Sequence, residues 1–457
     1  MPKKIIVFFL LFAFILSSGF GCKTNNQVTK EALEPITLNY WRVFDGQDAF
    51  AEIIQKYNAI HPNIKINYRK LRYEEYESEL LNALAEDRGP DIFSVHNTWM
   101  KKYETKLAPL PETISMAYQV TEGTIKKEIV QKMQTTRSLS VQELRDTFVD
   151  VVSNDVILSD GKIYGLPLSV DTLAMYYNKD LFNNAGISEV PAYWNQDFIQ
   201  TVKALTRQNE EKEIIQSGAA LGGSNNVNRF SDILSVLMMQ SGTIMSNERN
   251  QILFHTSPNN SNTYFPGIDA LRFYSDFANP AKESYSWNES LPNSLEMFIS
   301  GNLAIMFSYS YDMATIKTQA PKINFSIAKL PQIEGLPPTN VNFANYWVEA
   351  VSKKSSHINE AWDFVQFMTK AENVRSYLSI SQKPTALRSL IAEQKQDDNL
   401  KVFAEQVLTS KSWYRGKNVT AAEQALGEMV NMATMADSSL LKDIINIGAT
   451  KVQQTLY

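Results

Sequence analysis

The sequence predicts an α/β protein with more than one domain. Strand-like and helix-like patterns alternate from residue 36 to residue 95, which is typical of parallel sheets covered by helices. The chain has 457 residues, more than one hydrophobic core usually supports, so we expect two or three domains. Its single cysteine, Cys22, allows no disulfide within the chain, and stability must therefore come from burial of apolar side chains.

The first strand is predicted over residues 36–41, where apolar and polar residues alternate. The pair Asp45-Gly46 then signals a turn. Apolar residues at helical spacing predict a helix between Phe50 and Ile60, which Pro62 closes.

The same order repeats immediately along the chain. A strand is expected over residues 64–68, an amphipathic helix around Leu80, a break at Gly89-Pro90 and a further strand over residues 92–95. Such a βαβαβ unit forms parallel strands with right-handed crossovers, and ligands gather beyond the carboxyl ends of its strands. Those ends are residues 41–47 and 96–99.

The middle of the chain carries weaker patterns. Residues 112–155 are polar and are predicted to be mostly helical, as an insertion on the first domain. Residues 162–168 are extended, and Pro167 favours an edge or a crossover because it lacks a backbone donor. An apolar strand is predicted over residues 173–178.

Later elements follow the same logic. Helices are predicted around Phe198, over residues 233–239 after a polar glycine loop, around Leu271, and over residues 295–301 with Gly301 as the terminating glycine. The strand over residues 303–307 is followed by an aromatic and polar segment, residues 308–312, which is predicted to be a loop.

The first 22 residues have the order of a secretory signal: Lys3-Lys4, an apolar run over residues 5–16, small residues, and then Cys22. The signal resembles that of bacterial lipoproteins, in which the cysteine is acylated and becomes the first residue, although Gly19 and Phe20 depart from the usual pattern. The alternative is a secreted protein that loses Cys22. Residues 23–35 are polar without apolar periodicity, as expected of a tether.

Charge excludes one class of partner. Removal of residues 1–21 takes away Lys3 and Lys4 and leaves 42 basic against 49 acidic residues, so the formal net charge falls from −5 to −7. An acidic chain of this kind is not expected to bind nucleic acid. No cofactor and no metal are expected, and a lipid anchor is the only membrane contact predicted.

Four segments in fixed order carry a family resemblance: residues 89–92, residues 160–182, residues 298–306, and Trp413-Tyr414. Together they resemble the extracellular solute-binding proteins of ABC importers, in particular the carbohydrate group that includes the maltodextrin-binding proteins. The resemblance implies a two-lobed, periplasmic-binding-protein-like α/β fold (type II), with the ligand in a hinged cleft.

The resemblance also implies domain limits and partners. The N-terminal lobe would comprise residues 36–167 plus 346–384, and the C-terminal lobe residues 168–345 plus 385–457. The protein would be a monomer that hands its solute to the permease of an importer. Two segments depart from the family pattern by replacing glycines with bulk, residues 308–310 and residues 343–347, and they leave the size and identity of the ligand open.

Sugar recognition explains which residues to examine. Stacking an aromatic ring on the C–H face of a sugar removes apolar surface from water, worth about 2 kcal/mol, and the hydroxyl groups need donors and acceptors. Asp accepts, Asn does both, and Trp donates and stacks. The candidate ligand-binding residues are Asp45, His96, Asn97, Asp171, Asn226, Tyr311, Trp347 and Trp413. A structural role is the alternative for each of them, whereas Trp362 lies in a helical pattern and is expected in the core.

Two other classes of function stay open. The sequence matches no phosphate loop, nucleophile elbow or zinc-protease helix, so no enzyme is expected, but a polysaccharide hydrolase needs only two carboxylates brought together in space. A binding protein for a peptide or an anionic solute would use Arg42, Lys101 or Arg415 at the cleft.

Overall fold

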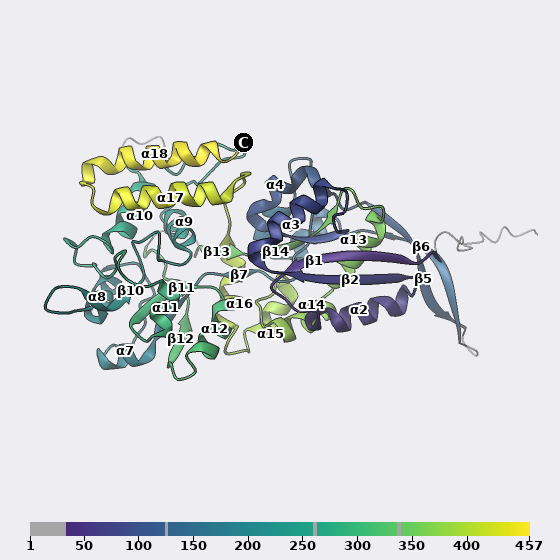
Figure 1. Cartoon of the computed structure of the whole chain (residues 1–457), viewed down its shortest axis with the longest axis horizontal. Coiled ribbons are helices and arrows are strands. Elements are labelled where there is room, and N and C mark those ends of the chain that lie inside the picture. The colour runs from purple at the N-terminus through teal and green to yellow at the C-terminus, as the bar shows by residue number, and fades with distance from the viewer. Residues whose placement is uncertain (1–32, 124–126, 259–262, 336–339) are drawn as a thin grey trace, which may run out of the picture.

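The computed structural model describes residues 33–123, 127–258, 263–335 and 340–457. These residues form two lobes side by side, joined by short extended segments (Figure 1). The predicted signal, Cys22 and most of the tether lie outside the described residues. Within the four described ranges, none of the helices has the length and apolar character that crossing a membrane requires.

The N-terminal lobe is built on a five-stranded sheet in the order β2-β1-β3-β14-β4. Strands β1 (Ile36–Val43), β2 (Ile64–Leu71) and β3 (Ile92–His96) are parallel, and helices α2 (Asp48–Ile60) and α3 (Tyr73–Ala85) connect them. The predicted βαβαβ unit is therefore confirmed. Strand β14 (Trp347–Ser352) pairs antiparallel with both β3 and β4 (Leu107–Ala108).

The order of strands brings distant parts of the sequence together. Strand β14 enters this sheet from the last third of the chain, and the helices after it pack on the same lobe. Further helices around this core are α4 (Met100–Tyr103), α13 (Ile358–Met368), α14 (Ala371–Ser381) and α15 (Ile391–Gln394).

The prediction of a mostly helical segment over residues 112–155 is wrong for its first half. Strands β5 (Thr113–Glu122) and β6 (Glu128–Arg137) form an antiparallel ribbon, and only then follow helices α5 (Val141–Thr147) and α6 (Asp150–Val156). The ribbon extends away from the other lobe (Figure 1). Most residues of β6 and of the outer half of β5 are exposed or only half-buried, so no buried face imposes the two-residue alternation that would indicate a strand.

The C-terminal lobe has its own five-stranded sheet in the order β12-β8-β11-β10-β9. Its strands are β8 (Ala174–Asn178), β9 (Arg207–Gln208), β10 (Ile214–Ala219), β11 (Leu303–Ser308) and β12 (Phe325–Ala328). The strands β8, β10 and β11 carry mostly buried residues. This is the pattern of a sheet covered on both faces.

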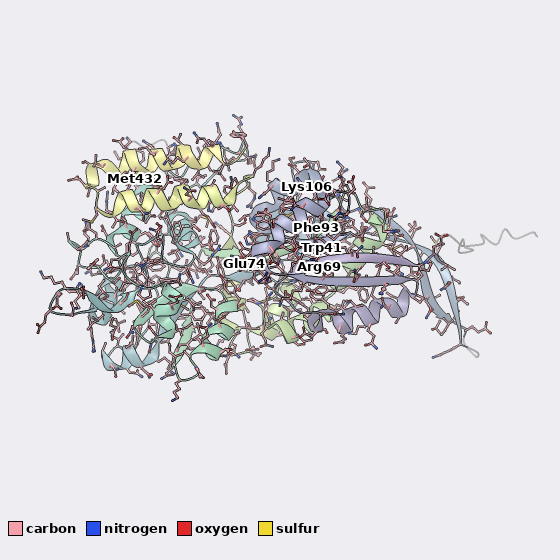
Figure 2. All side chains as sticks on the ribbon, viewed as in Figure 1. Trp41, Arg69, Glu74, Phe93, Lys106 and Met432 are labelled. Carbon is pink, nitrogen blue, oxygen red and sulfur yellow. The ribbon has the colours of Figure 1, made fainter. Side chains whose placement is uncertain are left out.

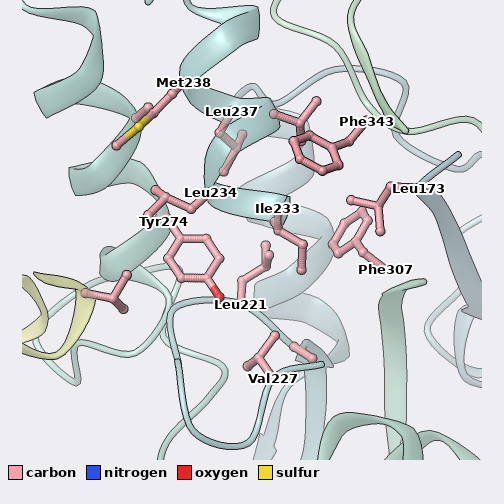
Figure 3. Packing of buried hydrophobic residues seen from close by; sticks show 14 of the residues in the cluster. Leu173, Leu221, Val227, Ile233, Leu234, Leu237, Met238, Tyr274, Phe307 and Phe343 are labelled. Atoms are coloured by element: carbon pink, nitrogen blue, oxygen red, sulfur yellow. The ribbon is translucent and has the colours of Figure 1, made fainter. Parts of the chain in front are cut away.

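Helices pack around this second sheet, some on its strands and some on one another. They are α7 (Lys179–Asn184), α8 (Gln196–Leu205), α9 (Phe230–Gln240), α10 (Pro266–Asp276), α11 (Ser294–Ile299), α12 (Tyr311–Gln319), α16 (Lys401–Gln406), α17 (Val419–Thr434) and α18 (Leu441–Gln454). Figure 3 shows how Leu234 and Met238 of α9 pack with Tyr274 of α10 in the core of this lobe.

Two details concern the predicted boundaries. Gly301 ends α11 with a φ of +80°, the left-handed conformation expected of a terminating glycine. The prediction that residues 308–312 form a loop is wrong at its end, because α12 begins at Tyr311. Asp312 accepts a hydrogen bond from the Ser308 hydroxyl, which closes the short turn between β11 and α12.

A third small sheet lies between the lobes. It contains three short strands from separate parts of the chain: β7 (Asp171–Thr172), β13 (Asn342–Asn345) and β15 (Ser410–Lys411), with β13 in the centre. Just before β7, a single antiparallel bridge pairs Ser169 with Thr385. We call these three strands the hinge sheet. The domain limits given above stay a prediction.

The buried Trp362 offers a direct test of the N-terminal core. It is fully buried, as expected, and its indole N–H donates to the Ala108 carbonyl at 3.3 Å. We expect Trp362→Ala to lower the free energy of unfolding by about 3–5 kcal/mol, because it leaves a large cavity. Chemical denaturation measures this loss, and Met435→Ala, at a residue that is 72% exposed, is the control expected to change it by less than about 0.5 kcal/mol. A Trp362 variant as stable as the wild type would contradict the packing.

Candidate functional site

A cleft lies between the two lobes. It encloses about 800 Å³ of empty space, a volume that includes its open mouth. One wall comes from the N-terminal lobe, the other from the C-terminal lobe, and β13 forms part of the floor. The lining side chains with polar or aromatic chemistry are Tyr73, His96, Thr98, Trp99, Arg229, Ser231, Asp232, Ser235, Phe343, Asn345, Ser412, Trp413, Tyr414, Thr420 and Glu423.

His96 lines the N-terminal wall at the end of β3. Its Nδ1 lies 2.7 Å from the Thr98 hydroxyl, and its Nε2 lies 3.0 Å from Asn345 Oδ1 of the hinge sheet. A neutral ring that accepts at Nδ1 and donates from Nε2 satisfies both contacts. Burial lowers the pKa of His96 to about 4, so this neutral form persists at physiological pH.

Trp347 anchors an aromatic layer behind this wall. It lies opposite His96 in the pairing of β14 with β3, and the two rings are 5.3 Å apart. It also meets Trp99 edge-on at 5.2 Å and Tyr76 at 5.9 Å. Edge-to-face contacts at these distances fix the orientation of each ring. The wall is therefore rigid before any solute arrives.

Arg229 and Asp232 form the centre of the C-terminal wall. Arg229 precedes α9 with a φ of +59°, and its Nε and Nη2 donate to the same Asp232 oxygen at 2.8 and 2.6 Å. The Tyr309 hydroxyl donates to that oxygen at 2.6 Å. Burial alone would lower the pKa of Arg229, but the Asp232 carboxylate raises it above its usual value. The guanidinium is thus charged and largely neutralised by its own neighbour.

Glu423 of α17 adds a second carboxylate to this wall. Burial raises its pKa; Arg229 opposes this effect and Asp232 adds to it. Burial also raises the pKa of Tyr73 on the other wall of the cleft. Arg229 lowers the pKa of Tyr73, and Glu423 raises it. The cleft therefore offers donors and acceptors without a strong excess of positive charge.

Trp413 closes the inner part of the C-terminal wall. It is buried, its indole N–H donates to the Ser235 hydroxyl at 2.9 Å, and it meets Tyr414 edge-on at 5.6 Å. Part of its ring lines the cleft. Its role as a stacking residue stays a prediction.

Asp155 of α6 holds the segment that carries Trp413. Its carboxylate is buried and accepts hydrogen bonds from the Ser412 hydroxyl at 2.7 and 2.8 Å and from the Arg415 guanidinium. The Tyr346 hydroxyl donates to it at 2.7 Å from the strand connection beside the hinge. A buried carboxylate is stable only with such a set of donors. Arg415 is therefore occupied by Asp155.

Asp171 lies in the hinge sheet, opposite Asn345. One of its oxygens accepts from the backbone N–H and the hydroxyl of Ser310 at 2.9 and 2.7 Å, and the other from Thr172 N–H at 2.9 Å. These bonds hold the residue before Tyr311, whose ring stacks on Tyr309 at 5.8 Å and is 48% exposed. Asp171 and Tyr311 do not line the cleft itself.

Asp45 belongs to a buried network under the N-terminal wall. It accepts from Lys383 at 2.7 and 2.9 Å and from the Tyr377 hydroxyl at 3.0 Å, and it pairs with Arg42 at 2.9 Å. Burial alone would raise the pKa of Asp45, but Arg42 and Lys383 lower it. Arg42 also pairs with the fully buried Glu349 at 2.8 Å. The carboxylate of Asp45 is thus held by protein groups.

The two candidate asparagines have different surroundings. Asn97 is buried and donates to Asp155 at 3.2 Å. Asn226 donates to the carbonyls of Asn288 and Leu291, both at 2.9 Å, and accepts from the Trp287 indole at 2.8 Å. Neither lines the cleft. Of the eight candidates, His96 and Trp413 line the cleft and Trp347 supports its wall.

Sequence reasoning missed Tyr73, Trp99, Arg229, Asp232 and Glu423. Tyr73, Asp232 and Glu423 lie near the starts of α3, α9 and α17, where polar residues are ordinary. Only Trp99 had a visible signal, because it lies in the predicted strand-end segment 96–99. Which helix starts face the cleft depends on packing between parts of the chain that are far apart in sequence.

Two lobes, a hinge sheet and a cleft with donors and aromatic rings on both walls define a solute-binding protein. The model of the family "Bacterial extracellular solute-binding protein" matches residues 45–375, and the chain belongs to this family. Members bind solutes and are not enzymes, so the hydrolase alternative is set aside.

Individual relatives are distant. The melibiose/raffinose/stachyose-binding protein MelE of Bacillus subtilis is 20% identical over 86% of this chain and 83% of its own. The sn-glycerol-3-phosphate-binding periplasmic protein UgpB of Salmonella typhimurium is 24% identical over 79% of this chain and 76% of its own. Among solved structures, the cyclic alpha-maltosyl-1,6-maltose binding protein from Arthrobacter globiformis is similar with a TM-score of 0.70 and 18% identity, covering 92% of this chain and 99% of that one. The structural likeness confirms the two-lobed fold.

The half-buried Asp171 predicts a pH dependence of stability. Burial raises its pKa to about 7, against the hydrogen bonds from Ser310 and Thr172, so the folded protein keeps this proton when the unfolded chain has lost it. The wild type should therefore lose stability relative to Asp171→Asn as pH rises from about 4 to 7, by up to about 1.4 kcal/mol per pH unit, with no further change above 7.

Denaturant titrations at several pH values measure this difference. Asp437→Asn is the control, because the backbone N–H of Ser439 lowers the pKa of Asp437 and its effect appears only as pH falls through the acidic range. A difference between wild type and Asp171→Asn that is constant from pH 4 to 7 would contradict the assignment.

Proposed function

We propose that this protein captures a saccharide in the cleft between its lobes and delivers it to the permease of an ABC importer. The observation that carries the proposal is the composition of the cleft: Trp413 lines it from the C-terminal lobe, and Trp99, which meets Trp347 edge-on, lines it from the N-terminal lobe. Such a pair of apolar surfaces suits the two C–H faces of a sugar ring. MelE, a relative named for sugar binding, supports the same ligand class.

Polar groups beside these rings suit hydroxyl groups. Arg229 and Tyr309 both donate to Asp232 Oδ2, so Asp232 Oδ1 remains as an acceptor for the ligand. The Glu423 carboxylate is a second acceptor, and Nη1 of Arg229 remains as a donor. On the opposite wall, Thr98 and Asn345 bring further donors and acceptors around His96. Each buried sugar hydroxyl needs such partners, since an unpaired one costs about 1–3 kcal/mol.

The remaining candidates from the sequence take supporting roles in this proposal. Asp171 positions Tyr311 at the edge of the C-terminal wall, Asn97 contributes to the Asp155 network, and Asp45 fixes the turn after β1. Asn226 shapes the loop before α9. Their loss would act on ligand affinity through the geometry of the cleft.

An anionic solute is the second candidate, because UgpB is named for binding sn-glycerol-3-phosphate and Arg229 lines the cleft. The charges favour a neutral ligand instead. Arg229 already donates two hydrogen bonds to Asp232. Arg42 and Arg415 form ion pairs with acidic side chains of the protein itself. A phosphate would have to displace a carboxylate and would also meet Glu423.

Delivery would rest on closure and on attachment. A sugar held by one wall gains contacts with the other only when the lobes approach, which shifts the population towards the closed form. The permease would then bind the closed arrangement of both lobes. Acylation at Cys22 would keep the monomeric protein outside the cell at the membrane, with residues 23–35 as a tether.

Thermal unfolding against a panel of solutes tests the ligand class. A saccharide at 100 times its dissociation constant should add about 2.7 kcal/mol to the free energy of unfolding, and the sugar should be recovered intact. Peptides and phosphorylated compounds, sn-glycerol-3-phosphate among them, are the controls. A response to those alone, without any response to sugars, would contradict the proposal.

Replacement of Trp413 tests the site. We expect Trp413→Ala to weaken saccharide binding by about 1–3 kcal/mol, measured by calorimetry, because it removes the stacking surface. Trp41→Ala is the matched control: Trp41 lies on β1 under the Arg69 guanidinium at 4.7 Å, outside the cleft (Figure 2). Equal affinities for wild type and the Trp413 variant would show that the ligand does not lie against this ring.

A further inference from the structure

Two exposed aromatic residues stand together at the edge of the cleft. The rings of Phe44 and Tyr73 are stacked with centroids 5.6 Å apart and planes at 19°. Each residue is 51% exposed. Both rings meet Trp347 edge-on, at 6.0 and 6.3 Å. We call Phe44 and Tyr73 the aromatic platform.

The backbone at Phe44 is held in a costly conformation. Its φ is +67°, and Asp45 N–H donates to the Val43 carbonyl at 2.8 Å, which closes a three-residue γ-turn around Phe44. A positive φ is disfavoured for a bulky residue, and this kind of γ-turn is rare and strained. The turn is held in place because the Asp45 carboxylate is tied to Lys383 and Arg42.

Packing in a core does not explain why the strained turn carries a phenylalanine, because Phe44 is exposed. Glycine at residue 44 would adopt the same turn without the cost, and a polar residue would avoid exposing an aromatic ring to water. The chain instead holds a phenyl ring outward against Tyr73. Observed strain is commonly found where a ligand is bound.

The platform continues the N-terminal wall outward. Tyr73 lines the cleft, whereas Phe44 contacts Tyr73 and Trp347 without lining it and is half exposed at the surface beside it. Tyr73 is the first residue of α3, and Figure 2 shows its neighbour Glu74 on the side of the lobe that faces the other lobe. From Trp99 through Trp347 to Tyr73 and Phe44, aromatic rings form one continuous path out of the cleft.

We infer that the aromatic platform is an outer subsite that stacks a second sugar ring of an oligosaccharide whose first ring lies in the cleft. This inference rests on the proposed function and narrows it, because a monosaccharide in the cleft would leave Phe44 unused. The half-exposed ring of Phe44, supported by Tyr73, supplies the apolar surface that the C–H face of a sugar needs.

Affinity as a function of chain length tests the subsite. The probes are glucose, maltose, maltotriose and maltotetraose, and the matching series from mannose, measured by calorimetry on the purified protein from residue 23 onward. Wild-type affinity should rise from one sugar unit to two or three in the series that binds. Phe44→Ala should reduce the affinity for the longer sugars about tenfold or more and leave the monosaccharide within about twofold.

A second variant separates the ring from the shape of the turn. Phe44→Gly also lacks the ring but relieves the positive φ, so it should unfold at a higher denaturant concentration than Phe44→Ala while showing the same loss of affinity for longer sugars. Tyr193→Ala, at a residue that is 44% exposed and outside the cleft, is the matched control and should bind every sugar as the wild type does.

The outcomes of these measurements test the outer subsite separately from saccharide binding in the cleft. Wild-type affinity that does not depend on chain length, or Phe44 variants that bind long sugars normally, would overturn the platform and leave saccharide binding standing. The same holds if the Phe44 variants bind all sugars normally but fail only in uptake, which would make the platform a contact for another protein. A wild type that binds no sugar of any length would overturn the proposed function itself.

Discussion

The hinge sheet is the constraint on which the cleft depends. Its three strands come from parts of the chain that lie far apart in sequence, and two of them lead within a few residues to a residue at the cleft. Strand β13 carries Asn345 at the floor and continues into Trp347, and β15 leads to Ser412 and Trp413. Movement of one lobe must therefore bend these three strands together, and both walls of the cleft respond at once.

Buried charges fix both sides of this sheet. On one side, Asp155 binds Ser412 and Arg415, and on the other, Asp45 binds Lys383. Removal of charged groups from water costs several kcal/mol per ion, so these pairs add little net stability, but a partner left alone would be strongly unfavourable. Their effect is to restrict the positions that the connecting segments can adopt. A rigid wall of this kind lowers the cost of ordering the site when a ligand binds.

The sequence alone predicted the N-terminal βαβαβ unit, because local periodicity and turn residues define each of its elements. It failed for the ribbon of β5 and β6, whose outward part packs on no core and so shows no alternation. The start of α12 at Tyr311 was missed because the aromatic and polar residues before Asp312 show no helical pattern. The two-lobed arrangement came from the family resemblance and is confirmed by the structure.

The site was less predictable than the fold, for a physical reason. Trp413 and His96 could be named because tryptophan and histidine, with 7 and 4 residues, are rare and chemically distinctive in this chain. Asp232 and Glu423 could not, since an acidic residue near a helix start looks the same in a cleft and on a surface. Asp45 and Asn226 show the converse: residues suited to sugars turned out to bind protein groups.

The most direct test of the account is a measurement of closure. Small-angle X-ray scattering of the purified protein, with and without a saccharide that raises its thermal stability, reports the radius of gyration of the two lobes. Closure on the ligand predicts a smaller radius when the cleft is saturated, and peptide controls should leave the radius unchanged. An identical radius in the free and the saturated protein would contradict capture by movement at the hinge sheet.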